Sequence, residues 1–268
     1  MSDGATLLQR AWPPSDLRSG NMAGGWQCNG GRWPRSAATG SFILSCFIGL
    51  VCLAGCIGTR ARHGDLQETL FAPVNVVFMG DSITSFWGPG QPGDSDAFTV
   101  HPNWINSGVY GETSGQMLAR FQNDVIAQSP AMVHILAGTN DVYPGWVLCG
   151  GVQNVDTCDN IKAMVAMSRS AGIQVLLCTI PPWGPGDAAK GFDPSPDRYT
   201  RINQLNQWIE QFAADNELTI VDYHRLLVSS DGDTYVPDLT VDGIHPSPKA
   251  YTLMTPVAES AIANAQRK

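Results

Sequence analysis

The stretch VNVVFMGDSITSFW, residues 74–87, decides the fold of this chain. Its first part, Val74 to Met79, is apolar and rich in valine, which predicts a buried strand of a parallel sheet. The strand ends abruptly at Gly80-Asp81-Ser82. Open α/β sheets bind ligands beyond the carboxyl ends of their strands, so Ser82 is a candidate site residue. A lone Gly-Asp-Ser tripeptide is usually a turn, however, so its weight depends on the rest of the chain.

Strands and helices are predicted to alternate after this stretch. Apolar runs predict further strands over residues 104–106, 131–137, 173–180 and 218–221. Helical patterns cover about 114–126, 161–170, 197–216, 224–228 and 247–266. This alternation predicts an α/β fold, namely a three-layer α/β/α sandwich around a five-stranded, mostly parallel sheet, within residues 73–268.

Residues 1–56 form a leader of different composition. The 15-residue apolar run Ser41–Gly55 follows Arg32 and Arg35 and is typical of a secretory signal, being short for a membrane span. The run ends in Leu-Ala-Gly-Cys56, which resembles the bacterial lipobox, so we expect lipid attachment at Cys56 and an exported, membrane-anchored protein at the periplasm or cell surface. An ordinary signal peptide and an uncleaved anchor are the alternatives. Residues 57–72 are expected to be a linker.

Charge and cysteine content narrow the function classes. The 24 Asp and Glu residues outnumber the 16 Lys and Arg residues, and this acidic balance disfavours nucleic-acid binding. Cys149 and Cys158 flank a glycine-rich segment and could form a disulfide in an oxidising compartment, whereas Cys178 is expected to be a buried thiol. No Cys/His spacing is typical of zinc, and neither a metal nor a cofactor is indicated.

Four short blocks fall at predicted strand ends or before the last helix. They are GDSI at 80–83, VYGETS at 109–114, GTND at 138–141 and DGIHPS at 242–247. In order, spacing and strand context they resemble the blocks of the SGNH, or GDSL, hydrolase family, and the resemblance covers about residues 73–268. It implies the flavodoxin-like fold of that family and an esterase activity. The GxSxG motif of the α/β-hydrolases is absent, which fits the same interpretation.

The chemistry of these blocks suggests a role for each residue. Ser82 needs a base to act as a nucleophile, and His245 is the natural one because imidazole titrates near neutral pH. Asp242, three residues earlier, can hold the imidazole in the correct tautomer. The backbone N–H groups of Ser82 and Gly111 and the side-chain amide of Asn140 would form an oxyanion hole. Taken singly, each residue could instead be a cap, a turn or a surface hydrogen bond.

Other side chains are weaker candidates. His134 and His224 are expected to be structural. Aromatic residues near the blocks could line a substrate pocket or merely cover the sheet, and the substrate-contact candidates are Trp87, Tyr110, Tyr143 and Trp183.

The sequence therefore predicts a secreted or lipid-anchored serine esterase that hydrolyses small to medium acyl esters through an acyl-enzyme on Ser82. A carbohydrate O-acetylesterase or an acyltransferase of the same fold, and a non-catalytic carbohydrate- or lipid-binding module, remain alternatives. The expected partners are a small-molecule ester and, through the lipid anchor, a membrane. The oligomeric state and the start of translation, for which Met22 is a second candidate, stay open.

Overall fold

Five strands form one sheet in the order β2-β1-β3-β4-β5, and every neighbouring pair is parallel. They are β1 (Val76–Gly80), β2 (Trp104–Gly108), β3 (Met132–Leu136), β4 (Gln174–Cys178) and β5 (Thr219–Val221). The computed structural model describes residues 75–142, 148–149, 156–184 and 196–268, apart from the side chains of 196 and 197. The leader, the linker, Cys56 and Tyr143 lie outside this range. The predicted five-stranded sheet is confirmed.

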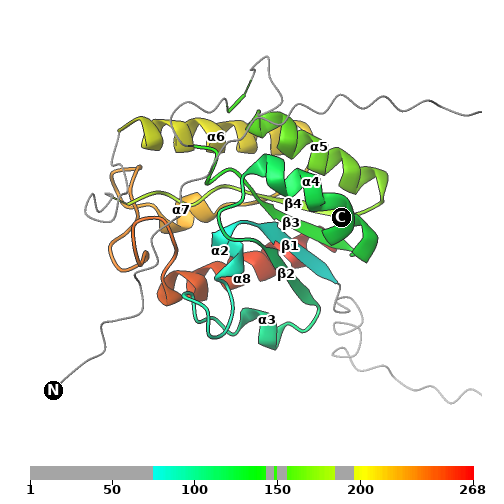
Figure 1. Cartoon of the computed structure of the whole chain (residues 1–268), viewed down its shortest axis with the longest axis horizontal. Helices are drawn as coiled ribbons and strands as arrows, with labels where there is room; N and C mark the ends of the chain where they lie inside the picture. The colour runs from blue at the N-terminus through cyan, green and yellow to red at the C-terminus, as the bar shows by residue number, and fades with distance from the viewer. Residues whose placement is uncertain (1–74, 143–147, 150–155, 185–195) are drawn as a thin grey trace, which may run out of the picture. The chain divides into compact units, whose positions relative to one another are not determined.

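Helices cover both faces of the sheet (Figure 1). One face carries α4 (Ser114–Asp124), α5 (Thr157–Ser170) and α6 (Pro196–Asp215), and the other carries α3 (Ala97–Val100) and α8 (Pro248–Ala265). The short helices α2 (Ser82–Ser85) and α7 (Tyr223–Leu227) follow β1 and β5 directly, and a 3₁₀ turn, η1 (Ile126–Gln128), follows α4. The predicted three-layer α/β/α architecture is thus confirmed.

The central strands are apolar along their length because both of their faces are covered. Every residue of β1 and β3 is buried, whereas the edge strand β2 exposes part of its length. The core continues into the helices through Met117 and Phe121 of α4, Ile161 of α5 and Tyr251 of α8. Burial on both faces explains why the middle strands appear in the sequence as continuous apolar runs.

Polar side chains fix the starts of the long helices. Thr113 and Gln116 form a capping box at α4, and Ser247 caps α8 ahead of Pro248. Helix α5 starts at Thr157 rather than at the expected 161, because the Asp156 carboxylate accepts hydrogen bonds from the first backbone N–H groups. The short helix α3 was not predicted.

The strand order reverses direction at β1. The chain passes from β1 outward to β2 and then returns to β3 on the other side of β1. In doubly wound sheets of this order, ligands bind at the carboxyl ends of the strands that flank the reversal. The segments that follow β1 and β3 carry Ser82 and Asn140, so the topology brings these two residues to one place.

Two further features concern the cysteines and the membrane. Cys149, which precedes α5, forms a disulfide with Cys158, which lies in the first turn of α5. Cys178, at the end of β4, is a buried free thiol. Among the described residues, no helix is both long enough and apolar enough to cross a bilayer.

Candidate active site

Ser82, His245 and Asp242 form a continuous hydrogen-bonded chain. Ser82 Oγ lies 2.9 Å from His245 Nε2, and His245 Nδ1 lies 2.6 Å from Asp242 Oδ2. When Nδ1 carries the ring hydrogen and donates it to the carboxylate, Nε2 is free to accept the serine hydroxyl hydrogen. Ser82 and His245 are both buried, so little water competes for these contacts. In this geometry the imidazole can remove the serine proton.

The turn before α8 explains why aspartate and histidine stand three residues apart. Asp242 Oδ1 accepts the backbone N–H groups of Ile244 at 2.9 Å and His245 at 2.8 Å, while Oδ2 faces the ring of His245. The same carboxylate therefore builds the turn and orients the imidazole. The His245 carbonyl oxygen in turn accepts from the Thr240 hydroxyl at 2.9 Å and the Val241 N–H at 3.0 Å. The histidine is fixed at its backbone as well as its ring.

The electrostatics favour an ionised Asp242. Partial burial alone would raise the pKa of its carboxyl group, but the hydrogen bonds from the His245 ring and backbone and from the Ile244 N–H, with the His245 charge, outweigh burial and hold the pKa below its ordinary value. Asp242 is therefore a carboxylate at neutral pH. A carboxylate at this position stabilises the imidazolium that forms when Nε2 takes a proton.

Close packing of α2 against the sheet positions Ser82. A Cβ atom on Gly80 would lie 2.0 Å from Thr84 Oγ1, and one on Gly108 would lie 2.2 Å from the Ser85 nitrogen. Only glycine fits at either strand end, so α2 lies directly on the ends of β1 and β2. The chain must turn immediately after β1, which leaves Ser82 at the first position of α2.

Asp81, next to Ser82 in the chain, is fully buried. Its Oδ1 accepts the Ile83 N–H at 2.8 Å and so caps α2. Burial raises the pKa of Asp81 to about 7, against the lowering effects of the Ile83 N–H, the His245 charge and the Thr139 hydroxyl; the Asp141 charge adds to the rise. The site thus contains a second carboxyl group whose charge changes near neutral pH.

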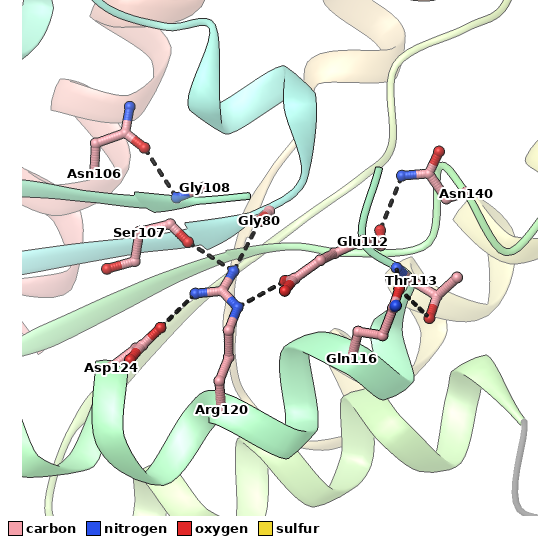
Figure 2. Close-up of polar contacts among 10 residues, drawn as sticks. All are labelled: Gly80, Asn106, Ser107, Gly108, Glu112, Thr113, Gln116, Arg120, Asp124 and Asn140. Atoms are coloured by element: carbon pink, nitrogen blue, oxygen red, sulfur yellow. Dashed lines mark hydrogen bonds and ion pairs between the residues drawn. The ribbon is translucent and has the colours of Figure 1, made fainter. Parts of the chain in front are cut away.

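Gly111 and Asn140 come from the loops after β2 and β3. Gly111 has a φ of +77°, a conformation that costs other residues strain, although a Cβ atom there would meet no neighbour within 4 Å. Asn140 Nδ2 donates to the Glu112 carbonyl oxygen at 2.9 Å (Figure 2). This bond joins the two loops and uses one of the two amide hydrogens of Asn140, leaving the second for another acceptor.

The other predicted oxyanion donors are backbone groups. Within the described part of the chain, no backbone or side-chain acceptor takes the N–H of Ser82 or of Gly111. Both hydrogens are therefore available to a bound group. Such donors stabilise an oxyanion when they are fixed before the charge develops.

Asp141 has a structural role that the sequence did not reveal. Its buried carboxylate accepts from the Ser114 N–H and hydroxyl and from the Thr157 hydroxyl, so it ties together the starts of α4 and α5. Burial raises the pKa of Asp141, and these hydrogen bonds oppose the rise. Because Asp141 directly follows Asn140, these hydrogen bonds also hold the loop that carries Asn140.

Two of the four substrate-contact candidates lie in the protein interior. Trp87 is 0% exposed: its ring packs against Phe78 and Tyr251, and its Nε1 donates to Thr255 Oγ1 at 3.3 Å. Trp183 is 4% exposed, with the Arg198 guanidinium 4.5 Å from the centre of its ring. The prediction that these two residues bind substrate is wrong, because the chain turns both rings into the protein.

Tyr110 and Phe86 lie at the rim of the site. Tyr110 is 59% exposed, and its ring is nearly parallel to that of His245 at a centroid distance of 6.3 Å. Phe86 is not one of the four candidates, and the centre of its ring lies 4.9 Å from that of His245 and 5.6 Å from that of Tyr110. Tyr110 therefore presents an exposed aromatic ring beside the His245 ring.

Only one group of three side chains in the described residues has the spacing of metal ligands: Cys149, Asp156 and Cys158. Two of the three are joined in the disulfide, and a disulfide sulfur is not the thiolate that binds metals. This group therefore does not fit a metal.

The parallel α/β/α sandwich and the Ser82–His245–Asp242 chain at its carboxyl edge are features of serine hydrolases. The chain belongs to the GDSL-like lipase/acylhydrolase family, whose model matches residues 78–253. A GDSL-like lipase from Bacteroides thetaiotaomicron is 35% identical, with a TM-score of 0.61 over 71% of this chain and 88% of that one.

Two curated proteins are more distant relatives. An acetylxylan esterase from Geobacillus stearothermophilus is 23% identical over 67% of this chain and 89% of its own length, and its solved structure aligns with a TM-score of 0.55. An uncharacterized lipoprotein of Bacillus subtilis, YqeF, is 26% identical over 48% of this chain and 57% of its own length.

Proposed function

We propose that this protein is an exported serine esterase that transfers acyl groups from Ser82 to water. The observation that carries the proposal is the unbroken chain from Ser82 Oγ through both nitrogens of His245 to Asp242, with distances of 2.9 and 2.6 Å. Membership of the GDSL-like lipase/acylhydrolase family supports the same reaction class.

The reaction would proceed in two halves. Ser82 Oγ attacks the ester carbonyl carbon while its proton moves to His245 Nε2, and that proton then leaves with the alcohol, giving an acyl-enzyme. In the second half His245 takes a proton from water, the hydroxide attacks the acyl carbon, and the proton returns to Ser82. The N–H groups of Ser82 and Gly111 and the Asn140 amide would bind the oxyanion, and losing one donor typically costs about 10²–10³ in rate.

The proposed substrates are esters of small to medium acyl groups. Among these, acetylated carbohydrate is a specific second proposal, supported by the exposed ring of Tyr110 beside His245 and by the relative named as an acetylxylan esterase. An aromatic face can pack against the apolar face of a sugar ring, and pockets combine such surfaces with a few polar groups. The leaving group, rather than the acyl chain, would then determine selectivity.

The proposal includes export and lipid attachment at Cys56. The apolar run Ser41–Gly55, the lipobox-like sequence that ends at Cys56 and the similarity to a protein named as a lipoprotein support it. Metabolic labelling with a fatty-acid analogue, compared with the Cys56→Ser variant, tests the attachment. Label that persists in the variant would exclude Cys56 as the attachment site.

The activity is tested by hydrolysis of p-nitrophenyl esters from acetate to decanoate, with Ser82→Ala as the matched control. We expect turnover that disappears in the variant, and a chain-length profile that narrows the substrate. Adding a sugar or alcohol acceptor and measuring the ester product tests the acyltransferase alternative. Absence of turnover on every ester and on acetylated xylan would instead favour the binding-module alternative.

A further inference from the structure

Arg120 lies on α4, and its guanidinium group makes four polar contacts at the carboxyl ends of β1 and β2 (Figure 2). Nε lies 2.6 Å from Glu112 Oε2, and Nη1 lies 2.7 Å from Asp124 Oδ2. Nη2 donates to the carbonyl oxygens of Ser107 at 2.8 Å and Gly80 at 3.1 Å. One side chain therefore holds two strand ends and two carboxylates.

Arginine suits this position because of its geometry. Its planar group has five N–H donors in a fixed arrangement, whereas lysine has one nitrogen and could not reach four acceptors that lie on different sides. The side chains of Arg120 and Glu112 are only 17% and 16% exposed. Such shielding strengthens charge-assisted hydrogen bonds compared with an ion pair in open solvent.

Glu112 connects Arg120 to the candidate oxyanion hole at two points. Its carboxylate is held by Arg120, while its backbone carbonyl oxygen accepts the hydrogen bond from Asn140 Nδ2 at 2.9 Å. Gly111, whose N–H is a candidate donor, directly precedes Glu112. A shift of Glu112 would therefore move the Asn140 amide and the Gly111 peptide together.

The capping box of α4 holds the other side of the same segment. The Thr113 N–H donates to Gln116 Oε1 at 2.9 Å, which fixes the residue after Glu112. On the opposite side, the Val109 N–H donates to the Gly80 carbonyl oxygen at 3.0 Å, the same oxygen that Arg120 contacts. Between these two anchors, Arg120 holds the side chain of Glu112 through its carboxylate, and Asn140 contacts its backbone carbonyl oxygen.

We propose that Arg120 is a positioning residue, which fixes Gly111 and Asn140 relative to Ser82 by holding Glu112 and the ends of β1 and β2. The inference rests on the proposed esterase function. Donors act only if they are in place when the oxyanion forms, so releasing Glu112 lowers turnover more than substrate binding. We expect a loss of about 10- to 100-fold in kcat, less than for removal of a whole donor, with KM nearly unchanged.

The test compares Arg120→Lys, Arg120→Met and Glu112→Gln with the wild type on p-nitrophenyl acetate. Arg169→Gln is the matched control, because Arg169 likewise donates to a backbone carbonyl oxygen, that of Asn216, at the far end of α5. All rates are divided by the concentration of active sites, titrated with a serine-reactive phosphonate. Arg120→Lys and Glu112→Gln retain much of the packing and keep the test valid if Arg120→Met does not fold.

A double-mutant cycle with Asn140→Ala separates positioning from general stability. If Arg120 acts through the Asn140 amide, the kcat loss caused by Arg120→Lys shrinks when Asn140 is already alanine. If Arg120 merely stabilises the fold, Arg120→Lys does not change kcat per active site. If it acts independently of Asn140, the kcat losses of Arg120→Lys and Asn140→Ala multiply in the double variant. Either of these last results overturns the proposal.

A second measurement does not require catalysis. The side-chain amide signals of Asn140 in ¹⁵N NMR spectra report its hydrogen bond to Glu112, and we expect them to shift in Arg120→Lys and Glu112→Gln but not in Arg169→Gln. Unchanged signals overturn the positioning role even if the wild type proves active. Shifted signals in a protein that hydrolyses no ester support positioning and contradict only the proposed esterase function.

Discussion

Two histidines in this protein lie next to hydroxyl groups, in two very different regions. His245 Nε2 lies 2.9 Å from Ser82 Oγ at the carboxyl edge of the sheet, and His134 Nε2 lies 2.8 Å from the Tyr223 hydroxyl in the core. The distances are almost the same. A histidine–hydroxyl hydrogen bond alone therefore does not identify a catalytic base.

The regions differ in what surrounds each ring. Asp242 Oδ2 lies 2.6 Å from Nδ1 of His245, whereas no hydrogen bond or ion pair joins a carboxylate to the ring of His134 in the described part of the chain. His134 stacks on Phe78 at 4.4 Å and contacts Cys178 Sγ at 3.1 Å. Burial lowers the pKa of His134 to about 3, so its ring stays neutral. The carboxylate partner, not the hydroxyl, distinguishes the two.

The largest predicted difference comes from removing each histidine in turn. His245→Ala should lower kcat by roughly 10⁴–10⁶, because the serine loses its base, with little change in the unfolding midpoint. His134→Gln should leave kcat per active site unchanged and lower the free energy of unfolding by about 1–3 kcal/mol. Steady-state kinetics and urea unfolding of both variants measure this contrast. Equal losses of kcat in the two variants would contradict the different roles assigned to His245 and His134.

Asp242→Asn should have the next largest effect. Asparagine keeps the shape of the turn but cannot stabilise the imidazolium in the same way, so we expect a fall in kcat of about 10⁴. The amide oxygen of asparagine can still accept the two backbone N–H groups that Asp242 Oδ1 accepts, so the loss reports mainly the missing carboxylate. The measurement is kcat at pH 8, with circular dichroism to confirm folding. A loss below about 10-fold would show that His245 needs no carboxylate.

Asp81→Asn should change how stability depends on pH. Folding raises the pKa of the Asp81 carboxyl group to about 7, so this group stays protonated up to a higher pH in the folded than in the unfolded state. Burial therefore costs little at pH 4, and the cost grows as pH rises towards 7 and is complete above it. The Asp81→Asn variant has no charge to bury, so it avoids this pH-dependent cost, and its amide oxygen can still accept the Ile83 N–H.

We expect the melting temperature of Asp81→Asn to match the wild type near pH 4 and to exceed it by about 5–10 °C at pH 8. Differential scanning calorimetry from pH 4 to 8 provides the test. A difference that stays constant across this range, or that is largest at pH 4, would contradict the burial of an ionisable Asp81.

The smallest predicted effect is that of Tyr223→Phe. The change removes the hydroxyl that faces His134, and among the described residues it leaves the buried Nε2 of His134 with the weak contact to Cys178 Sγ. We expect a loss of about 1–2 kcal/mol in the free energy of unfolding and no change in kcat. A fall in kcat without a fall in stability would mean that the core cluster is coupled to the site.

The sequence revealed those parts of the molecule that depend on local patterns. The strands are apolar runs because both sheet faces are covered, and the asparagine at 140 and the Asp242–His245 pair follow from the chemistry that each position needs. The start of α5 was placed too late because Asp156 caps the helix in a polar segment without apolar periodicity.

Side-chain direction and long-range contacts could not be predicted in the same way. Trp87 is five residues from Ser82, yet the short helix α2 reverses the chain and sends the ring into the core between Phe78 and Tyr251. Arg120 lies in the middle of α4, outside all four blocks. Its acidic neighbours Glu112 and Asp124 were the only sequence signal, and such spacing is common on exposed helices.

The most direct test of the account is to map the covalent adduct that a p-nitrophenyl phosphonate forms with the protein. Mass spectrometry of the digested protein should find the adduct on the peptide that contains Ser82, with no adduct in Ser82→Ala and a much slower reaction in His245→Ala. His134→Gln should react at the wild-type rate. Modification of another residue, or labelling that does not depend on His245, would contradict the claim that Ser82 is a nucleophile activated by His245.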